Sequence, residues 1–418
     1  MYKDNKEKYD VIVIGGGASG LMAAGAAAEN GKKVLVLEKN RELGKKLSIT
    51  GGGRCNITNA TFDVREFLKK FGDSGKFLFS PFSQFNIQDS FDFFEKRGLP
   101  LVTEARNRVF PKSQKASDVV KFMRKYASGS NINTSTDNPV RKISVDKDNG
   151  LIKFVETDKG KYYADNFIIA TGGSSHPETG TTGDGFKWLK KIGHTVKESS
   201  PNIVPLKSSD KWVKDLSGTS LSFMKITFFV NNKKAFSETG KVLFTHFGLS
   251  GPLILNAAYK VRDLLHEGKV TAEIDCYPDT DHGSLEKNIL KTFEKNKNKD
   301  FKNIVKDITP PGLENALIEF HIVPDVDTKV HSITKDERKQ IVQLLKAMPV
   351  NITGLMGMDR AVISDGGIPL SEVDTKTMKS KIYSNLYLTG DILHVNRPSG
   401  GYSLQLCWTT GYVAGQLN

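Results

Sequence analysis

The sequence predicts an α/β fold in which a parallel sheet is interrupted by an insertion with a β-rich part and a small helical part. Three observations support this prediction. A short apolar strand near the N-terminus runs into a glycine-rich turn and a helix, and two later strands run into glycine-rich segments of their own. Between those later strands, β-rich runs are followed by helical ones. A length of 418 residues allows two to four domains.

Composition and cysteine usage narrow the class of protein. With 38% hydrophobic and 26% charged residues, the chain is a globular protein with more than one core, which excludes a disordered or fibrous protein. Three widely spaced cysteines, Cys55, Cys276 and Cys407, can form neither a disulfide framework nor a CxxC metal site. We therefore expect a cytoplasmic protein with no bound metal.

Residues 11–28 form an uncharged, mostly apolar run that superficially fits a signal peptide or a membrane span. Five glycines in this run argue against both. The run is better interpreted as a strand over 9–14, a tight turn, and a helix over 19–30. We expect no membrane segment here.

The turn at the end of the first strand carries the spacing G-x-G-x-x-G at Gly15, Gly17 and Gly20. In this pattern the first glycine turns the chain, the second lets backbone approach a pyrophosphate, and the third permits close packing of helix on strand. The helix N-terminus then offers free N–H groups and a positive dipole to the anion.

The next apolar strand, 33–37, ends at Glu38, 18 residues after Gly20. An acidic side chain at this point can accept hydrogen bonds from a ribose 2′-OH and disfavours a 2′-phosphate. Together these features predict a dinucleotide site, for which FAD and NAD both remain possible.

Two later segments favour FAD. The strand 166–170 leads into a glycine-rich stretch that ends at Gly185, and the strand 386–388 leads into Thr389–Asp391, the sequence PSGGYSLQ and a small-residue helix. An FAD fold needs strands from distant parts of the chain to join one sheet. The terminal Asp391 can then lie near the ribityl chain while the last helix points its N-terminus at the isoalloxazine.

Several long motifs resemble those of one family. They are GGGASGLMAA, GKKLSITGGGRCNITN, RVFPKSQKASDVV, ATGGSSHPETGTTGDGF, THFGLSGPLIL and the terminal TGD…PSGGYSLQ. On these motifs, which cover nearly the whole chain, the sequence resembles the BaiN/RdsA-type (YhiN-like) NAD(P)/FAD-dependent oxidoreductases. The glutathione reductase and fumarate reductase flavoproteins are more distantly similar.

The resemblance implies a domain layout. A Rossmann-like FAD-binding domain would comprise residues 1–195 and 348–418. A substrate-side insertion would comprise a β-rich, β-barrel-like part over residues 196–280 and 323–347 and a helical subdomain over 281–322.

The resemblance also implies which segments bind FAD. The loop Ser48–Asn59 would cross the pyrophosphate and the flavin, with Arg54 offsetting phosphate charge. The expected FAD-binding residues are Gly15, Gly17, Ala18, Ser19, Gly20, Glu38, Lys39, Lys46, Ser48, Gly52, Gly53, Arg54, Cys55, Asn56, Val140, Ala170, Thr171, Gly172, Gly390, Asp391, Gly400, Gly401 and Tyr402.

Electron transfer through a pair of thiols is disfavoured, because no second cysteine lies within 200 residues of Cys55. We interpret Cys55 as a buried neighbour of the flavin, and Cys276 and Cys407 as core residues. Only one dinucleotide fingerprint is evident. We therefore expect NAD(P)H, as the probable electron donor, to dock transiently at the flavin.

A reductase also needs a proton donor, and His176, His246, His394 and Tyr402 are candidates because imidazole and phenol can deliver protons. We favour His246, His394 and Tyr402, although each also fits a structural role. His394 stands where many relatives carry an acidic residue, and Ser403 follows Gly400–Tyr402 where many relatives carry asparagine.

Net charge suggests a class of partner. The formal charge is +13, and residues 1–130 hold 23 basic and 14 acidic side chains. The densest basic stretch is Arg106–Lys125, which could follow RNA phosphates near Phe110, Phe122 and Tyr126. No RRM, KH or OB pattern accompanies it.

Three functions fit the sequence. The favoured one, implied by RdsA-type members, is reduction of a uridine to dihydrouridine in rRNA. An alternative, implied by BaiN-type members, is reduction of a small apolar enone of the 3-oxo steroid or bile-acid type. A third is a non-catalytic flavin-binding redox sensor.

Overall fold

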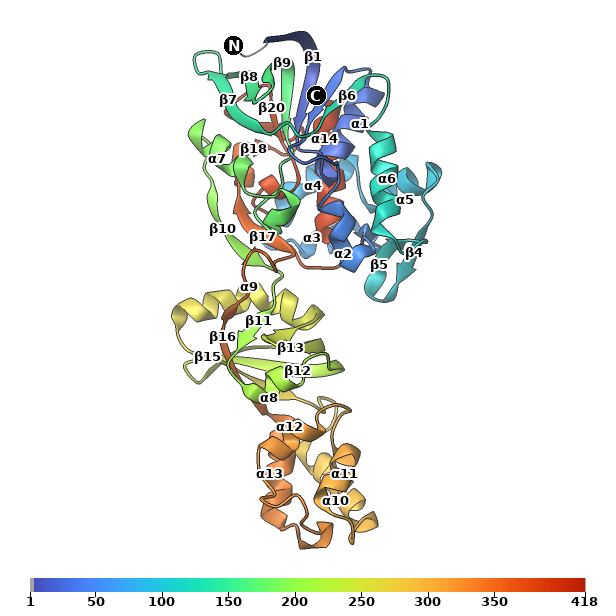
Figure 1. Cartoon of the computed structure of the whole chain (residues 1–418), viewed down its shortest axis with the longest axis vertical. Helices are drawn as coiled ribbons and strands as arrows, with labels where there is room; N and C mark the ends of the chain where they lie inside the picture. The colour runs from blue at the N-terminus through green and yellow to red at the C-terminus, as the bar shows by residue number, and fades with distance from the viewer. Residues whose placement is uncertain (1–3, 418) are drawn as a thin grey trace. The chain divides into compact units, whose positions relative to one another are not determined.

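A computed structural model describes residues 4–417. Their packing divides the chain into two units (Figure 1). Unit 2 is Asn202–Ala361, and unit 1 comprises the described residues before and after it. The chain therefore leaves unit 1, forms unit 2 and returns at Val362.

The core of unit 1 is a sheet with a run of parallel strands. In order across the sheet these are β20 (Leu386–Leu388), β9 (Gly160–Ile169), β1 (Asp4–Ile14), β2 (Val34–Leu37) and β6 (Ile132–Ser135). Val13 pairs with Val36 on one side and with Ile168 on the other. Apolar residues of the central strands, such as Val13, Val36 and Ile168, are buried because both faces of the sheet are covered there. The carboxyl ends of the parallel strands lie at one edge.

Antiparallel strands extend this sheet. Beyond β20 lie β19 (Lys379–Ser380) and β18 (Val373–Asp374), and β8 (Leu151–Thr157) pairs with both β9 and β7 (Val140–Asp146).

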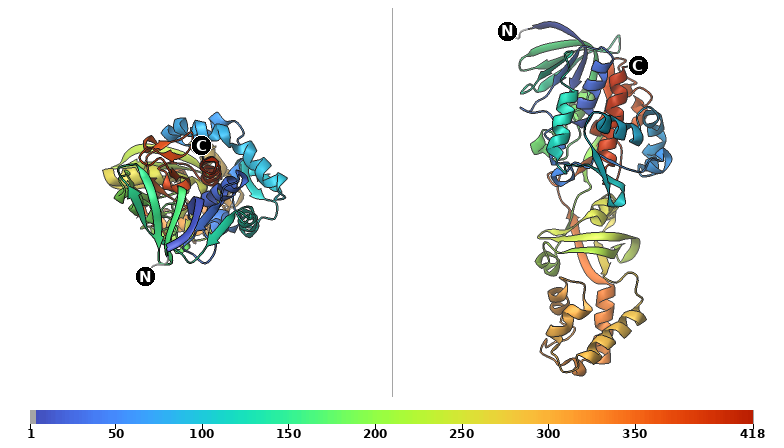
Figure 2. Two further views of the ribbon diagram at one scale, coloured as in Figure 1. Left: turned by 90° about the horizontal axis from the view of Figure 1, so that it is seen from above. Right: turned by 90° about the vertical axis from the view of Figure 1, so that its right-hand side faces the viewer.

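Helices α1 (Ala18–Glu29) and α14 (Tyr402–Gln416) lie side by side on the sheet (Figures 1 and 2). Glycines permit this contact, because a Cβ added at Gly411 would lie 2.4 Å from the Ser19 carbonyl oxygen. A Cβ at Gly415 would lie 2.6 Å from the Ala23 carbonyl oxygen. The helices are parallel but offset, so α14 begins about 12–14 Å before the start of α1, at a rise of about 1.5 Å per residue.

Further elements of unit 1 pack around this core. They are α3 (Val64–Lys69), α4 (Gly75–Gln84), α5 (Ile87–Lys96), α6 (Ala116–Tyr126), α7 (Asp184–Lys191), the small sheet of β3 (Thr58–Asn59), β5 (Arg108–Pro111) and β4 (Leu101–Glu104), and the pair β10 (Lys197–Asn202) and β17 (Ile363–Gly367). Short 3₁₀ turns include η1 (Leu47–Ile49) and η7 (Gly390–Ile392), and α2 (Thr50–Gly53) follows η1.

Unit 2 contains a closed barrel and helices. The barrel strands, in order, are β11 (Leu206–Ser208), β14 (Gly248–Ser250), β13 (Lys233–Thr245), β12 (Ser220–Val230), β15 (Val270–Asp275) and β16 (Met348–Leu355). The helices are α8 (Lys211–Asp215), α9 (Pro252–Glu267), α10 (His282–Lys295), α11 (Phe301–Ile308), α12 (Glu314–Glu319) and α13 (Lys335–Lys346). Alternating barrel residues such as Ile226 and Phe228 are fully buried.

The predicted fold class is confirmed, and the structure adds detail to the layout. Residues 323–347, expected in a β-rich part, contain helix α13, because its apolar positions recur at helical spacing behind a Thr334 capping box. β16, which the sequence assigned to the FAD-binding domain, completes the barrel of unit 2 instead, and the chain re-enters unit 1 at Val362.

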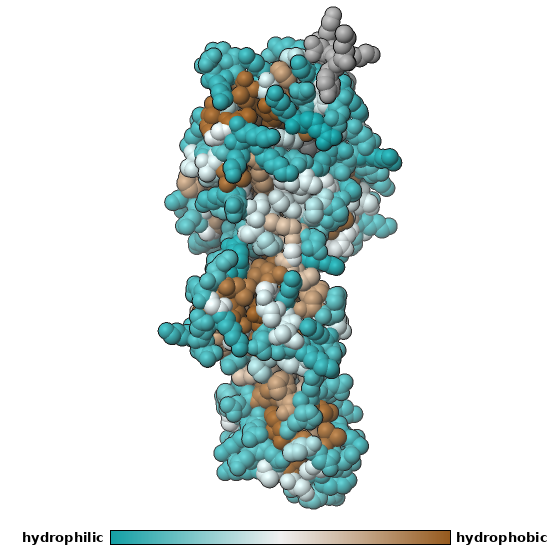
Figure 3. Space-filling view, turned by 60° about the vertical axis from the view of Figure 1, so that its left-hand side comes forward, coloured by the Kyte–Doolittle hydropathy of each residue, from teal (hydrophilic) through white to brown (hydrophobic). Residues whose placement is uncertain are grey.

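Figure 3 shows one face of the molecule, on which hydrophilic side chains predominate and apolar ones gather in separate areas. Across residues 4–417, no helix is long and apolar enough to span a membrane.

Candidate functional site

The glycine turn after β1 brings three parts of unit 1 into close contact. Gly15 has a φ of +106°, and a Cβ there would lie 2.6 Å from the Ala170 carbonyl oxygen at the end of β9. A Cβ at Gly20 would lie 1.9 Å from the Gly15 carbonyl oxygen. At Gly17, by contrast, an added Cβ meets nothing within 4 Å. The turn is therefore tightly packed against the protein at Gly15 and Gly20, and open to solvent or a ligand at Gly17.

Gly17 is the N-cap of α1, and no side chain caps this helix end. The first N–H groups of α1 thus face the open side of the turn, where the helix dipole favours an anion.

Glu38 follows β2 and is buried. One carboxylate oxygen accepts from Gly16 N at 2.7 Å, and the other accepts from both Asn40 N and Asn40 Nδ2 at 2.8 Å. A carboxylate has about four acceptor positions, so these bonds orient Glu38 and still leave acceptor capacity for a hydroxyl group.

A wall opposite α1 follows the end of β9. Thr171 Oγ1 is buried and has no hydrogen-bond partner among residues 4–417. Thr179 Oγ1 bonds to the His176 carbonyl oxygen at 2.7 Å and lies 3.3 Å from Thr181 Oγ1. This wall therefore carries hydroxyl groups, and Thr171 Oγ1 packs towards Gly185 of α7, where an added Cβ would lie 2.2 Å from it.

These elements border an open cavity whose non-atom space, which includes solvent at its mouth, is about 860 Å³. A neighbouring cavity of about 420 Å³ shares Gly15, Glu38, Thr171 and Gly180 with it. The two cavities lie along the carboxyl edge of the parallel strands, where α/β folds bind nucleotides.

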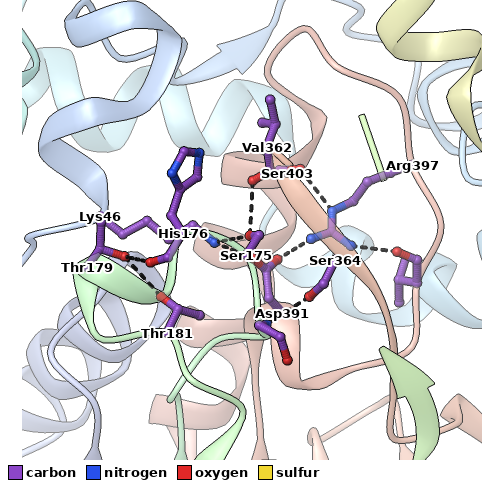
Figure 4. Close-up of polar contacts among 12 residues, drawn as sticks. Lys46, Ser175, His176, Thr179, Thr181, Val362, Ser364, Asp391, Arg397 and Ser403 are labelled. Carbon is purple, nitrogen blue, oxygen red and sulfur yellow. Dashed lines mark hydrogen bonds and ion pairs between the residues drawn. The ribbon is translucent and has the colours of Figure 1, made fainter. Parts of the chain in front are cut away.

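Charged side chains meet at one end of the larger cavity (Figure 4). Lys46 Nζ donates to Ser175 Oγ at 2.6 Å and lies 3.7 Å from Asp391 Oδ2. Arg397 pairs with the other oxygen of Asp391 and donates to Ser403 Oγ at 3.0 Å. Burial lowers the pKa of the Lys46 ammonium below its usual value, against the pull of Asp391.

Many of the residues expected to bind FAD surround these cavities. Those on the larger one are Gly15, Gly17, Ala18, Ser19, Glu38, Lys46, Ala170, Thr171, Gly172 and Asp391. Lys39 and Val140 line the smaller one. The others, which line neither, are Gly20, Ser48, Gly52, Gly53, Arg54, Cys55, Asn56, Gly390, Gly400, Gly401 and Tyr402.

Arg54 and Cys55 are held by the protein itself. Arg54 pairs with Glu104, donates to Gln114 Oε1 at 2.6 Å, and stacks on Phe110 with its guanidinium carbon 4.0 Å from the ring centre. Cys55 is fully buried, and burial raises the pKa of its thiol to about 12. A neutral, buried thiol fits a structural residue.

The proton-donor candidates lie in different surroundings. Tyr402 is buried with its ring centre 4.6 Å from that of Phe67, and burial raises its pKa. His394 is half-buried, and its backbone N donates to the Ile368 carbonyl oxygen. His176 contacts Glu178 at 2.8 Å. His246 is exposed at the turn between β13 and β14 of unit 2. Their catalytic roles stay predictions.

One arrangement outside the cavities resembles a hydrolytic triad. His194 Nδ1 contacts Glu372 Oε2 at 2.7 Å, and His194 Nε2 contacts Ser380 Oγ at 2.9 Å. Ser380 is buried, however, and its Oγ accepts from the backbone N–H groups of Ile382 and Tyr383. Burial lowers the pKa of His194. We interpret this group as a structural clamp.

Sequence reasoning missed part of the larger cavity's lining. The missed residues are Gly16, Asn40, Gly44, Lys45, Leu47, Thr50, Thr179, Gly180, Thr181, Val362, Ile363, Ser403, Leu404 and Cys407. Helical spacing offered a signal for Ser403, Leu404 and Cys407, which lie on one face of α14. Val362 and Ile363 carry no motif.

FAD fits this donor set. The open side of Gly17 leaves space for a pyrophosphate at α1, and Glu38 keeps acceptor capacity for a ribose hydroxyl. Asp391 would accept from a further hydroxyl.

The open side of Gly17 generates a prediction. Gly17→Val places a branched side chain in the cavity without a clash in the protein, so we expect the variant to fold and to lose FAD binding at least tenfold. Absorbance near 450 nm after reconstitution with FAD measures binding, and thermal unfolding of the apoprotein measures folding.

Gly129→Ala is the control, because an added Cβ there also meets nothing within 4 Å and Gly129 lines neither cavity. Full FAD binding by Gly17→Val would contradict the placement of the pyrophosphate.

Comparison with known proteins agrees with this geometry. The HI0933-like protein Rossmann domain matches residues 9–417. The 3-dehydro-bile acid delta(4,6)-reductase of Clostridium scindens is 28% identical over 409 residues, which cover 97% of each chain. The ribosomal RNA dihydrouridine synthase of Escherichia coli is 25% identical over 410 residues, which cover 98% of each chain.

Solved structures share the fold. The open conformation of a flavocytochrome c3 fumarate reductase has a TM-score of 0.55 at 16% identity and covers 99% of this chain and 78% of its own. The 3-ketosteroid-delta4-(5alpha)-dehydrogenase from Rhodococcus jostii RHA1 also has a TM-score of 0.55, at 12% identity, covering 98% and 96%. The chain belongs to the HI0933-like Rossmann-domain family and is an FAD-dependent oxidoreductase.

Proposed function

We propose that this protein reduces a C=C bond conjugated to a carbonyl group, with a uridine of rRNA as the favoured substrate and dihydrouridine as the product. The names of the two full-length relatives support the reaction class, because both describe saturation of a ring double bond. Bound FAD would supply a hydride from its reduced isoalloxazine.

The chain's own residues would position this chemistry. The α1 N-terminus and Glu38 would bind the adenosine diphosphate half of the cofactor, and Asp391 and Lys46 would orient the other half. NAD(P)H is the proposed electron donor, docking transiently because one dinucleotide fingerprint is evident in the sequence. An rRNA substrate and the absence of a cysteine framework support a cytoplasmic location.

The observation that favours RNA is a set of unpaired cations beside the cavity wall. Arg106, Lys112, Lys115, Lys121 and Lys125 are exposed and form no ion pair with the residues that the structure describes. Exposed cations without carboxylate partners remain available to phosphates.

These cations are connected to the cavity through α6. A Cβ at Gly44, which lines the cavity, would lie 3.1 Å from Val120 Cγ1 of α6. Arg124 Nη2 of the same helix donates to the Leu43 carbonyl oxygen at 2.6 Å. RNA phosphates bound along α6 would thus lie one helix away from the flavin site.

A paired map of rRNA modifications tests the substrate. We expect a dihydrouridine in rRNA of wild-type cells that is absent from cells lacking this gene and returns on complementation. Mass spectrometry of rRNA fragments detects the two added hydrogens. Identical spectra with and without the gene would contradict an rRNA substrate.

A charge-reversal variant tests the basic surface. With Lys112, Lys115 and Lys121 all changed to glutamate, RNA affinity should fall at least tenfold, because three phosphate contacts are lost. The slope of log affinity against log salt should become shallower by about 2, at about 0.7 per contact with single-stranded RNA.

The matched control reverses Lys291, Lys295 and Lys299, which are exposed in and just after α10 of unit 2. This control changes the net charge by the same amount. Equal losses of RNA affinity in both triple variants would show that net charge alone attracts RNA, and not the surface formed by Lys112, Lys115 and Lys121.

A small apolar enone is the second candidate substrate. The supporting observation is that the bile-acid reductase matches this chain over nearly its full length at 28% identity. This alternative predicts that a 3-oxo-Δ4 steroid reoxidises the reduced flavin. Turnover should not change with salt, nor in the variant with Lys112, Lys115 and Lys121 changed to glutamate.

A further inference from the structure

Lys46 and Asp391 line the larger cavity, and the buried Arg397 pairs with Asp391 behind that wall, so the charge of this cluster is unbalanced. Two cations share a single carboxylate, so this charge cluster carries a net charge of +1 while Lys46 is protonated. Asp391 and Arg397 act on the Lys46 ammonium, and so does the exposed carboxylate of Glu178, which is paired with His176. Glu38, the other carboxylate on the cavity wall, is held by Gly16 and Asn40 instead.

The excess charge is fixed in place. The side chain of Arg397 is 1% exposed, and its guanidinium also donates to the Val395 carbonyl oxygen at 2.5 Å. Arginine stays charged even when buried. Lys46 is held by Ser175 Oγ, and the cavity-lining Cys407 stays neutral because burial raises its thiol pKa to about 12.

A partly buried cation without a full counter-charge costs free energy, because protein replaces the water that would solvate it. A ligand that brings negative charge to this end of the cavity recovers part of that cost. The N-terminal turn of α14, with Ser403 and Leu404 on the cavity wall, adds positive dipole in the same region.

The offset between the helices indicates which part of FAD lies here. A pyrophosphate at Gly17 occupies the start of α1, and α14 begins about 12–14 Å further out, at about 1.5 Å per residue. Glu38 and the smaller cavity provide for the adenosine on the other side. Arg397 donates to Ser403 in the first turn of α14, so the isoalloxazine is the part of FAD that we expect to extend towards the charge cluster.

We propose that Lys46 and Arg397, held together by Asp391, stabilise the negative charge of the reduced isoalloxazine and so raise the reduction potential of bound FAD. Adding two electrons and one proton to the neutral isoalloxazine leaves a charge of −1, which the cluster's excess cation balances. The inference rests on FAD binding in this cavity and does not depend on which substrate is reduced.

The test is the midpoint potential of FAD bound to the intact protein, measured anaerobically with xanthine, xanthine oxidase and a reference dye. Arg397→Gln and Lys46→Gln each remove one cation, so we expect each to lower the equilibrium constant for two-electron reduction about tenfold, which is about 30 mV. Asp391→Asn removes the anion and should shift the potential upward by a similar amount.

Shifts of the midpoint potential in opposite directions distinguish an effect of charge from an effect of altered packing. Loss of packing would weaken FAD binding in all three variants without reversing the sign for Asp391→Asn. Arg397→Lys, which keeps the charge, should retain a potential near that of the wild type. Arg141→Gln is the matched control, because Arg141 belongs to an exposed ion pair with Asp158 and lines neither cavity.

Unchanged potentials, or shifts of the same sign in all three variants, would overturn the proposal. Weaker FAD binding at an unchanged potential would assign the cations to the pyrophosphate and would equally overturn it. If an Arg397 variant does not fold, Lys46→Gln and the isosteric Asp391→Asn still show whether the midpoint potential shifts in opposite directions. The xanthine oxidase system reduces the flavin without substrate or NAD(P)H, so a failure here is distinct from a failure of the proposed reaction.

Discussion

The site depends on how closely three backbone segments approach one another at the start of α1. Gly15 lies against the end of β9, Gly20 lies against Gly15, and Gly411 of α14 lies against Ser19 of α1. A side chain at any of these glycines would meet a carbonyl oxygen at 2.6 Å or less. Because the contacts are this short, the N-terminal ends of two helices and the end of the parallel sheet can border one cavity.

The charges around that cavity follow from the same geometry. The N-terminus of α1 favours the phosphates of a dinucleotide, and the charge cluster beside the same cavity carries one cation more than it has anions. Glu38, between α1 and β6, is oriented by hydrogen bonds from its own chain. The groups that we propose for cofactor binding and for tuning the flavin therefore border one cavity within unit 1.

Local patterns made much of this site predictable. The glycine turn, Glu38 and Asp391 are each specified by a strand and the few residues that follow it, so spacing alone placed them at the cavity. The fold class followed from the same strands. Val362 and Ile363 were unpredictable because they enter the wall only after the chain has built Asn202–Ala361, and no local pattern marks them.

Ion pairs between residues far apart in the sequence could not be predicted either. Arg54 is expected from its glycine-rich loop to meet phosphate, yet Glu104, 50 residues later, pairs with it across the fold. Arg397 carries no motif signal, and its importance appears only once Asp391 and Lys46 are seen beside it. Such tertiary ion pairs depend on which strands become neighbours, and single-sequence patterns do not specify them.

A crystal structure of the protein with FAD bound is the most direct test of the account. We predict the pyrophosphate against Gly17 at the start of α1, a ribose hydroxyl on Glu38, and the isoalloxazine directed towards Lys46, Asp391 and Arg397. FAD bound outside this cavity, or with its adenine at the charge cluster, would contradict the account.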